Sequence, residues 1–306
     1  MPDFRFKLGM FLNELQMPFE EGLRTAREIG AEYVWFDSLK DQPNLAAMSD
    51  DQIDEIGEQV ARNDLKLFMV ATGSPFKKIH LSDLGLDSMN DNAEFRADLD
   101  ALVRSMEIAN RLNVGAVLAY TFAWPGEYVG KKATWPMRWL TRGGVIAEVD
   151  MEKLVKVFSL VLDRAEEHDV DVVLSMMPWN YTNTTGNFRL LAERLNSRRI
   201  KVMWGPADNM NCGEKDVATS GFINVRPYLN SLHLKDLHVI DGIQLNFEYR
   251  PIGEGDVDFP AILQNLKSNG SDVVLASATH FRPESGSPAE AMRINYANLN
   301  SLFERV

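Results

Sequence analysis

The fold of this chain is decided by two nearby stretches, Ser231-Leu-His-Leu-Lys-Asp236 and Pro251-Ile-Gly-Glu-Gly-Asp-Val-Asp-Phe259. The first indicates a short, mostly apolar strand over Ser231–Leu234 that ends in charged residues. The second leads into an apolar-periodic run over Phe259–Leu266 that indicates a helix. A strand, a polar loop and a helix form one unit of an alternating α/β chain. The remainder of the sequence is best understood as repeats of this unit.

The same unit recurs along the whole chain. Apolar runs predict strands at Phe6–Leu12, Tyr33–Phe36, Leu67–Ala71, Ala116–Tyr120, Val170–Leu174, Ile200–Met203, Ser231–Leu234 and Val273–Ala276. Apolar periodicity predicts helices at Pro18–Gly30, Ile53–Val60, Phe95–Ala109, Leu154–Ala165, Phe188–Leu195, Phe259–Leu266 and Pro288–Phe303, with a short turn at Val225–Leu229. Eight such strand–helix units in a chain of this length favour a closed (β/α)8 TIM barrel of the α/β class over an open sheet. No linker rich in Gly, Ser or Pro interrupts residues 1–306, so we expect one domain.

Composition and charge disfavour several classes of protein. Cys212 is the single cysteine and cannot form an internal disulfide. The segment Met1–Leu8 lacks the apolar core of a signal peptide, and no later stretch is apolar for long enough to span a membrane. These features predict a cytoplasmic protein. A formal net charge of −12 repels phosphate backbones and disfavours nucleic acid as a partner.

Two insertions are longer than the other connections, at Thr121–Val149 and Leu237–Asp258. Each follows the C-terminal end of a predicted strand. In (β/α)8 barrels, loops at these ends build the active site. We therefore expect both insertions to lie over the C-terminal mouth of the barrel.

The second half of the chain resembles the sugar isomerases and epimerases that have a xylose-isomerase-like barrel. The stretch Ser231–Asp236 resembles the H-x-K-D strand of that family, and Pro251–Phe259 resembles its G-E-G-x-v-D-f loop. Val172–Pro178, Val202–Asn209 and Val274–Phe281 resemble its fifth, sixth and eighth strands. The resemblance implies a barrel that acts on a sugar, a sugar phosphate or a polyol by moving a proton next to a carbonyl.

The resemblance also implies a divalent metal (Mn, Mg, Zn or Co) at the mouth. The family's usual ligands are a Glu after strand five, an Asp after strand six, a His on strand seven and a Glu after strand eight. The matching positions here hold Ser175, Gly205, His233 and Ala278. One imidazole does not hold a divalent ion that needs several oxygen ligands, so we expect no metal and no other cofactor. A rearranged site of His233, His280 and Asp208 is a less favoured alternative.

Proton transfer is assigned to His233, Lys235 and Glu254. His233 is expected to titrate near neutral pH, Lys235 shares its strand face, and Glu254 lies on the loop that follows. Residues at or after strand ends are expected to contact substrate: Asn13, Asp37, Trp135, Arg138, Arg142, Trp179, Asp208, Asp236, Arg250 and His280. Tryptophan faces suit the apolar face of a sugar ring, and arginines suit a carboxylate or phosphate. Structural salt bridges and contacts within a homo-oligomer remain alternative roles for these residues.

Two functions remain open at the level of sequence. The first is an isomerase or epimerase that works without the usual metal. The second is a catalytically silent barrel that binds a sugar-like ligand or supports a partner subunit. A nuclease of the same architecture is disfavoured by the acidic charge and by only five histidines.

Overall fold

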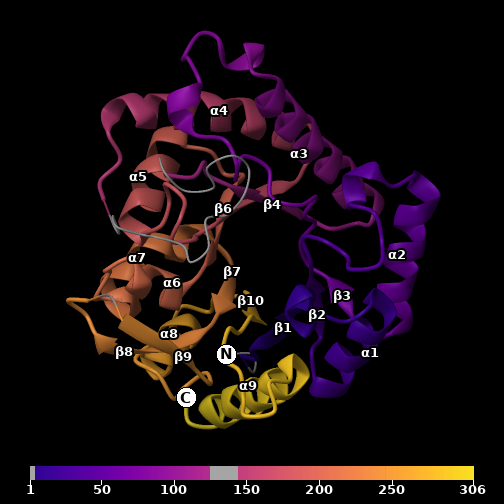
Figure 1. The fold of residues 1–306 in the computed structure, drawn as a ribbon, viewed down its shortest axis with the longest axis vertical. Coiled ribbons are helices and arrows are strands. Elements are labelled where there is room, and N and C mark those ends of the chain that lie inside the picture. The colour runs from indigo at the N-terminus through magenta and orange to yellow at the C-terminus, as the bar shows by residue number, and fades with distance from the viewer. Residues whose placement is uncertain (1–3, 125–143, 245) are drawn as a thin grey trace.

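The protein folds as a barrel of parallel strands ringed by helices (Figure 1). The structure is a computed structural model, and it describes residues 4–124, 144–244 and 246–306. The strands of the main sheet are β1 (Lys7–Phe11), β2 (Tyr33–Trp35), β3 (Lys66–Leu67), β4 (Ala116–Tyr120), β5 (Asp171–Ser175), β6 (Ile200–Trp204), β7 (Leu229–Leu234) and β10 (Val274–Ser277). This 8-stranded sheet has the order β3-β2-β1-β10-β7-β6-β5-β4, and its neighbouring strands pair in parallel.

The two edges of this sheet meet just beyond β3. Val70 forms a parallel bridge with Val117 of β4. The amide of Val70 donates to the carbonyl of Ala116 at 3.0 Å, and the amide of Leu118 donates to the carbonyl of Val70 at 2.8 Å. These bonds close the sheet on itself, so the (β/α)8 fold expected from the sequence is confirmed.

Helices cover the outside of the strands (Figure 1). They are α1 (Phe19–Ile29), α2 (Asp50–Arg62), α3 (Ala93–Arg111), α4 (Glu148–Glu167), α5 (Thr185–Leu195), α6 (Pro206–Asn211), α7 (Phe222–Val225), α8 (Phe259–Ser268) and α9 (Pro288–Phe303). Helix α1 ends where expected, because Gly30 adopts a φ of 109° that favours glycine. None of the helices in the described residues is both long and apolar enough to cross a bilayer.

The structure differs from the sequence-based expectation in two places. The third strand is shorter than Leu67–Ala71, since only Lys66–Leu67 pairs regularly and Val70 makes an isolated bridge. The insertion after β7 contains an antiparallel hairpin of β8 (Asp236–Asp241) and β9 (Asn246–Arg250), where the sequence predicts only a loop. Most of this hairpin is exposed or half-buried, so it lacks the apolar signal by which the barrel strands were found.

The pleat of the barrel strands divides the core into two regions. The cluster inside the barrel comprises Trp35, Met69, Ala71, Ala116, Leu118, Tyr120, Ala123, Val173, Trp179, Met203 and Ala276. Because strand side chains alternate, a residue two positions beyond a member of this cluster points inward as well. Val173, Met203 and Ala276 therefore place Ser175, Gly205 and Ala278 on the inner face, at the C-terminal ends of their strands. A larger apolar cluster lies between the strands and the helices.

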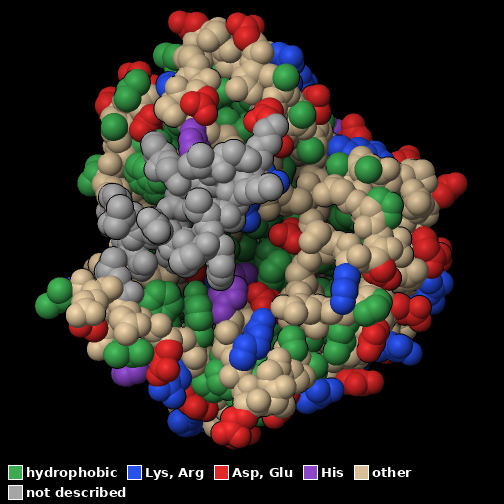
Figure 2. Space-filling view, in the orientation of Figure 1, with side chains coloured by type: hydrophobic (Ala, Val, Ile, Leu, Met, Phe, Trp, Pro, Cys, Tyr) green, Lys and Arg blue, Asp and Glu red, His purple; other side chains and the backbone are tan. Residues whose placement is uncertain are grey.

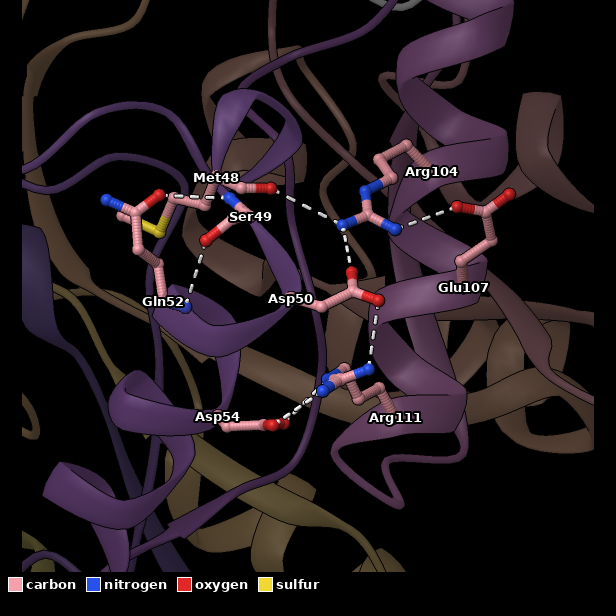
Figure 3. A network of polar contacts seen from close by, with 8 residues as sticks. All are labelled: Met48, Ser49, Asp50, Gln52, Asp54, Arg104, Glu107 and Arg111. Atoms are coloured by element: carbon pink, nitrogen blue, oxygen red, sulfur yellow. Dashed lines mark hydrogen bonds and ion pairs between the residues drawn. The ribbon is translucent and has the colours of Figure 1, made fainter.

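A charged network joins α2 to α3 outside the barrel (Figure 3). Arg111 pairs with Asp54 at 2.6 Å and with Asp50 at 3.0 Å, and Arg104 pairs with Asp50 at 2.8 Å and with Glu107 at 2.9 Å. Single exposed ion pairs contribute little to stability, but a network with shared partners fixes side-chain geometry better. The network holds the start of α2 against α3.

Gly9 of β1 lies in close contact with the neighbouring strand β10. A Cβ at this position would be 2.5 Å from Cγ1 of Val274 on the neighbouring strand β10. We predict that Gly9→Ala lowers the free energy of unfolding in urea by about 1–3 kcal/mol through overpacking. The matched control is Gly115→Ala, whose added Cβ would meet no atom within 4 Å. Equal stabilities of the two variants would contradict the packing of β1 against β10.

Candidate active site

Strand β7 places a charged residue at the mouth of the barrel. His233 and Lys235 share the inner face of this strand, and both are buried, with 5% and 2% of their surface exposed. The Nζ of Lys235 donates to both carboxylate oxygens of Asp208, at 3.0 and 3.1 Å. Asp208 lies in the first turn of α6, which Pro206 begins directly after β6, and it is also buried. Strand and helix thus hold a buried ion pair between them.

The ammonium of Lys235 keeps its charge in this position. Burial alone would lower the pKa of Lys235, but the Asp208 carboxylate, aided by Tyr249 and Glu14, outweighs that effect and raises the pKa above its usual value. Lys235 is therefore a fixed positive charge in a region from which water is largely excluded, where electrostatic effects on a ligand are strong.

His233 lies among aromatic rings inside the barrel. The ring centroids of Phe11 and Trp35 are each 6.0 Å from the imidazole, and Phe11 stacks on Trp35 at 4.1 Å. Burial and the charge of Lys235 hold the pKa of His233 well below its usual value. The expectation that His233 titrates near neutral pH is therefore wrong, because the surroundings favour a neutral imidazole. Among the described residues, Nδ1 of His233 and Nε1 of Trp35 have no hydrogen-bond partner.

Two carboxyl groups complete the acid–base groups of the mouth. Glu14 follows β1 in a 3-10 turn, is largely buried, and lies 3.8 Å from the guanidinium of Arg282. Burial raises the pKa of Glu14, although the charges of Lys235 and Arg282 oppose the shift. Burial also raises the pKa of Asp37, which follows β2 and accepts a hydrogen bond from the Ser38 hydroxyl at 3.0 Å. Sequence reasoning missed Glu14, although its neighbour Asn13 was selected on the same positional signal.

Asn13 has a positioning role in the structure. Its Nδ2 donates to the carbonyl and hydroxyl of Ser38 at 2.7 and 2.8 Å, and its Oδ1 accepts from the amide of Asp37 at 3.2 Å. These bonds tie the loop after β1 to the loop after β2. Asn13 therefore fixes the backbone that carries the Asp37 carboxyl.

A cavity of about 570 Å³ opens beside Asp37, over the loops that follow β2 and β3. Lys77 lines this cavity, and its Nζ lies 5.2 Å from the ring centroid of Trp179. Trp179 in turn lies 5.3 Å from the ring of Tyr120 inside the barrel. The face seen in Figure 2 is hollowed near its centre, and basic, acidic and histidine side chains gather around the hollow. Space for a polar ligand is therefore present beside these groups.

Other selected residues lie apart from this group. The carboxylate of Asp236 accepts from the backbone amides of Leu237, Gly253, Gly255 and Val257 at 2.9–3.2 Å, so it holds the loop after the hairpin. Glu254 is exposed and accepts from Nδ2 of Asn298 on α9 at 2.9 Å. The structure thus does not bring Asp236 or Glu254 to the group around Lys235.

Arg250 is exposed on β9 and pairs with Glu248 of the same strand. The imidazole of His280 lies 4.8 Å from the ring of Tyr249, at the exposed edge of the mouth. Desolvation of the imidazole by the surrounding protein, together with the charges of Lys235 and Arg282, lowers the pKa of His280 to about 3, so this ring is also neutral.

Three further residues expected to contact substrate, Trp135, Arg138 and Arg142, lie outside the described residues.

The side chains at this mouth do not provide the metal ligands that the family resemblance implies. Ser175 and Ala278 point inward but offer no carboxylate, and a Cβ on Gly205 would be 2.7 Å from Oδ2 of Asp208. That carboxylate is already bound to Lys235. Across residues 4–124, 144–244 and 246–306, no three His, Cys, Asp or Glu residues group closely enough to hold a metal ion, which includes His233, His280 and Asp208.

Comparison with known proteins agrees with this architecture. A family model described as "Xylose isomerase-like TIM barrel" matches residues 23–300 of the chain. A search of curated proteins finds no significant match.

Solved structures share the fold at low sequence identity. An L-ribulose 3-epimerase superposes with a TM-score of 0.71 and 13% identity, covering 98% of this chain and 95% of that one. The probable 3-DHS dehydratase AsbF from Bacillus anthracis gives 0.70 and 15%, covering 96% and 99%. The IOLI protein, solved with a zinc atom, gives 0.70 and 18%, covering 98% and 99%. Identities this low establish the fold alone.

The backbone hydrogen bonds that the Asp236 carboxylate accepts provide a test of how the loop after the hairpin is held. In Asp236→Asn, one carboxylate oxygen becomes an NH2 group that faces backbone N–H donors. We predict a loss of about 2–3 kcal/mol in the free energy of unfolding, because charge-assisted hydrogen bonds are lost and donors are left unpaired. Asp87→Asn is the control, since the Asp87 side chain is 97% exposed. If the free energy of unfolding falls no more in Asp236→Asn than in the control, the Asp236 carboxylate does not hold the loop.

The neutral state of His233 provides a test by pH. Its pKa in the folded protein is below the usual 6.5, so the unfolded chain binds this proton more readily. The resulting stability is complete above about pH 6.5 and is lost as the pH falls below that value. Between about pH 7.5 and about pH 5.5, the free energy of unfolding in urea should fall more for the wild type than for His233→Gln. An equal fall in both proteins would mean that His233 titrates as it does in the unfolded chain.

Proposed function

We propose that this chain, which belongs to the xylose isomerase-like TIM barrel family, is an isomerase or epimerase that moves a proton next to the carbonyl of a sugar-like ligand. The observation that carries the proposal is the placement of the buried Lys235 ammonium at the mouth, where its charge acts on the Glu14 carboxyl. An L-ribulose 3-epimerase with the same fold shows that such a barrel can carry this class of reaction. The ligand is a sugar, a sugar phosphate or a polyol derivative.

The proposed chemistry separates two tasks between these residues. A carboxylate accepts the proton from the carbon beside the carbonyl, and the electron pair of the broken C–H bond forms the enolate. The negative charge then collects on the former carbonyl oxygen, where the Lys235 ammonium stabilises it in a region of low dielectric. Return of the proton to the other face of the same carbon gives the epimer, and return to the neighbouring carbon gives the isomer.

Glu14 is the best candidate for the proton-accepting group. Burial raises its pKa toward the pH at which a general base works efficiently, and Lys235 and Arg282 keep a positive charge nearby. Asp37 shows the same direction of shift and is the candidate for the second proton-transfer group. Neutral His233 is better suited to hydrogen bonding a ligand through Nδ1 than to exchanging protons. Glu254, selected from the sequence for proton transfer, is not part of this scheme.

A second candidate function is a barrel that binds a sugar-like ligand without converting it. The observation in its favour is that the inward positions Ser175, Gly205 and Ala278 lack the acidic side chains of the family's active members. Binding without turnover, seen as a ligand-induced rise in melting temperature in a protein that shows no exchange, would select this function.

Hydrogen exchange with solvent tests the proposed reaction directly. The protein is incubated in D2O with aldoses, ketoses, keto-sugars and their phosphates, in the presence of EDTA, and deuterium at the carbon next to the carbonyl is followed by 1H NMR. We expect exchange with at least one substrate, and a reduction of about 10²-fold or more in Glu14→Gln, as for loss of a general base. Glu28→Gln, which changes an exposed residue of α1, is the matched control.

Lys235 is tested in the double variant Lys235→Met/Asp208→Asn, which avoids leaving a buried carboxylate unpaired. This variant should fold and lose exchange. Absence of exchange with every member of the substrate panel in the wild-type protein, both in EDTA and with added Mn2+, would contradict the proposed function.

A further inference from the structure

Asp208 occupies the space in front of Gly205, where the family places its strand-six aspartate. A Cβ on Gly205 would lie 2.7 Å from Oδ2 of Asp208 and 3.4 Å from its Cγ. The Asp208 carboxylate therefore fills the space that a side chain at position 205 would have to enter. It does so from α6 rather than from the strand end.

This carboxylate is already bound to a cation that belongs to the protein. Both of its oxygens accept hydrogen bonds from Nζ of Lys235, and 4% of Asp208 and 2% of Lys235 are exposed. A divalent ion would need the same oxygens, at distances of about 2.0–2.6 Å. An ammonium about 3 Å from those oxygens would repel an ion at such a position, so one carboxylate cannot serve both cations.

We infer that Lys235 has taken the place of the family's divalent ion, and that its ion pair with Asp208 excludes a metal from the barrel mouth. The remaining family positions agree, since Ser175 and Ala278 add no carboxylate that could compete with the ammonium for a metal ion. The use of the Lys235 charge on a substrate oxygen rests on the proposed function. The exclusion of metal does not, and it can be measured without turnover.

The first experiment measures metal content in the wild-type protein. The protein is equilibrated with Mn2+ or Zn2+, separated from free ion, and analysed for metal per chain. We expect no stoichiometric metal. Binding of one ion per chain that is lost in Asp208→Asn would overturn the inference, and this result does not depend on whether any Lys235 variant folds.

The second experiment removes the competing cation. In Lys235→Ala, the Asp208 carboxylate loses the ammonium bound to both of its oxygens, so we expect a Zn2+-dependent rise in melting temperature that the wild type lacks. Lys235→Ala/Asp208→Asn is the matched control and should show no such rise. A folded Lys235→Ala variant that responds to Zn2+ no more than this control would also overturn the inference.

The two proposals fail in different ways. Exchange catalysed only by metal-loaded wild-type protein would overturn the exclusion of metal and leave an isomerase or epimerase. Metal-free protein that converts no substrate would leave the exclusion of metal intact and remove the proposed reaction.

Discussion

The buried ion pair between Lys235 and Asp208 is the interaction on which the barrel mouth depends. Each charge would cost several kcal/mol to bury alone, so β7 and α6 must hold the two groups within hydrogen-bond distance. Removing one partner of such a pair costs about 3–5 kcal/mol, whereas replacing both by apolar residues is often neutral. The pair therefore adds little net stability. Its main consequence is a positive charge that stays fixed beside Glu14 and His233.

The pleat of β7 gives two neighbouring residues different tasks. Lys235 faces the inside of the barrel, whereas the next residue, Asp236, turns outward and accepts backbone hydrogen bonds from the loop after the hairpin. A Cβ on Gly255 would lie 2.3 Å from Oδ1 of Asp236, so the loop can approach the carboxylate only with glycine there. The two stretches that decide the fold in the sequence are thus one physical unit.

Sequence periodicity predicted the barrel because its strands and helices are apolar on the faces they bury. Helix α9 has the expected bounds, Pro288–Phe303. The β8–β9 hairpin was missed because it buries little, and Arg250 is exposed at the end of its second strand. At the site, the strand-end register could be predicted from the pattern. The low pKa of His233 and the pairing of Lys235 with Asp208 could not, because both depend on packing between segments distant in the chain.

The most direct measurement of the central claim is the anomalous scattering of manganese in crystals grown with excess Mn2+. The account predicts no manganese peak at the barrel mouth and the Nζ of Lys235 in contact with both oxygens of Asp208. A manganese ion bound by His233 and Asp208, with Lys235 displaced, would contradict it.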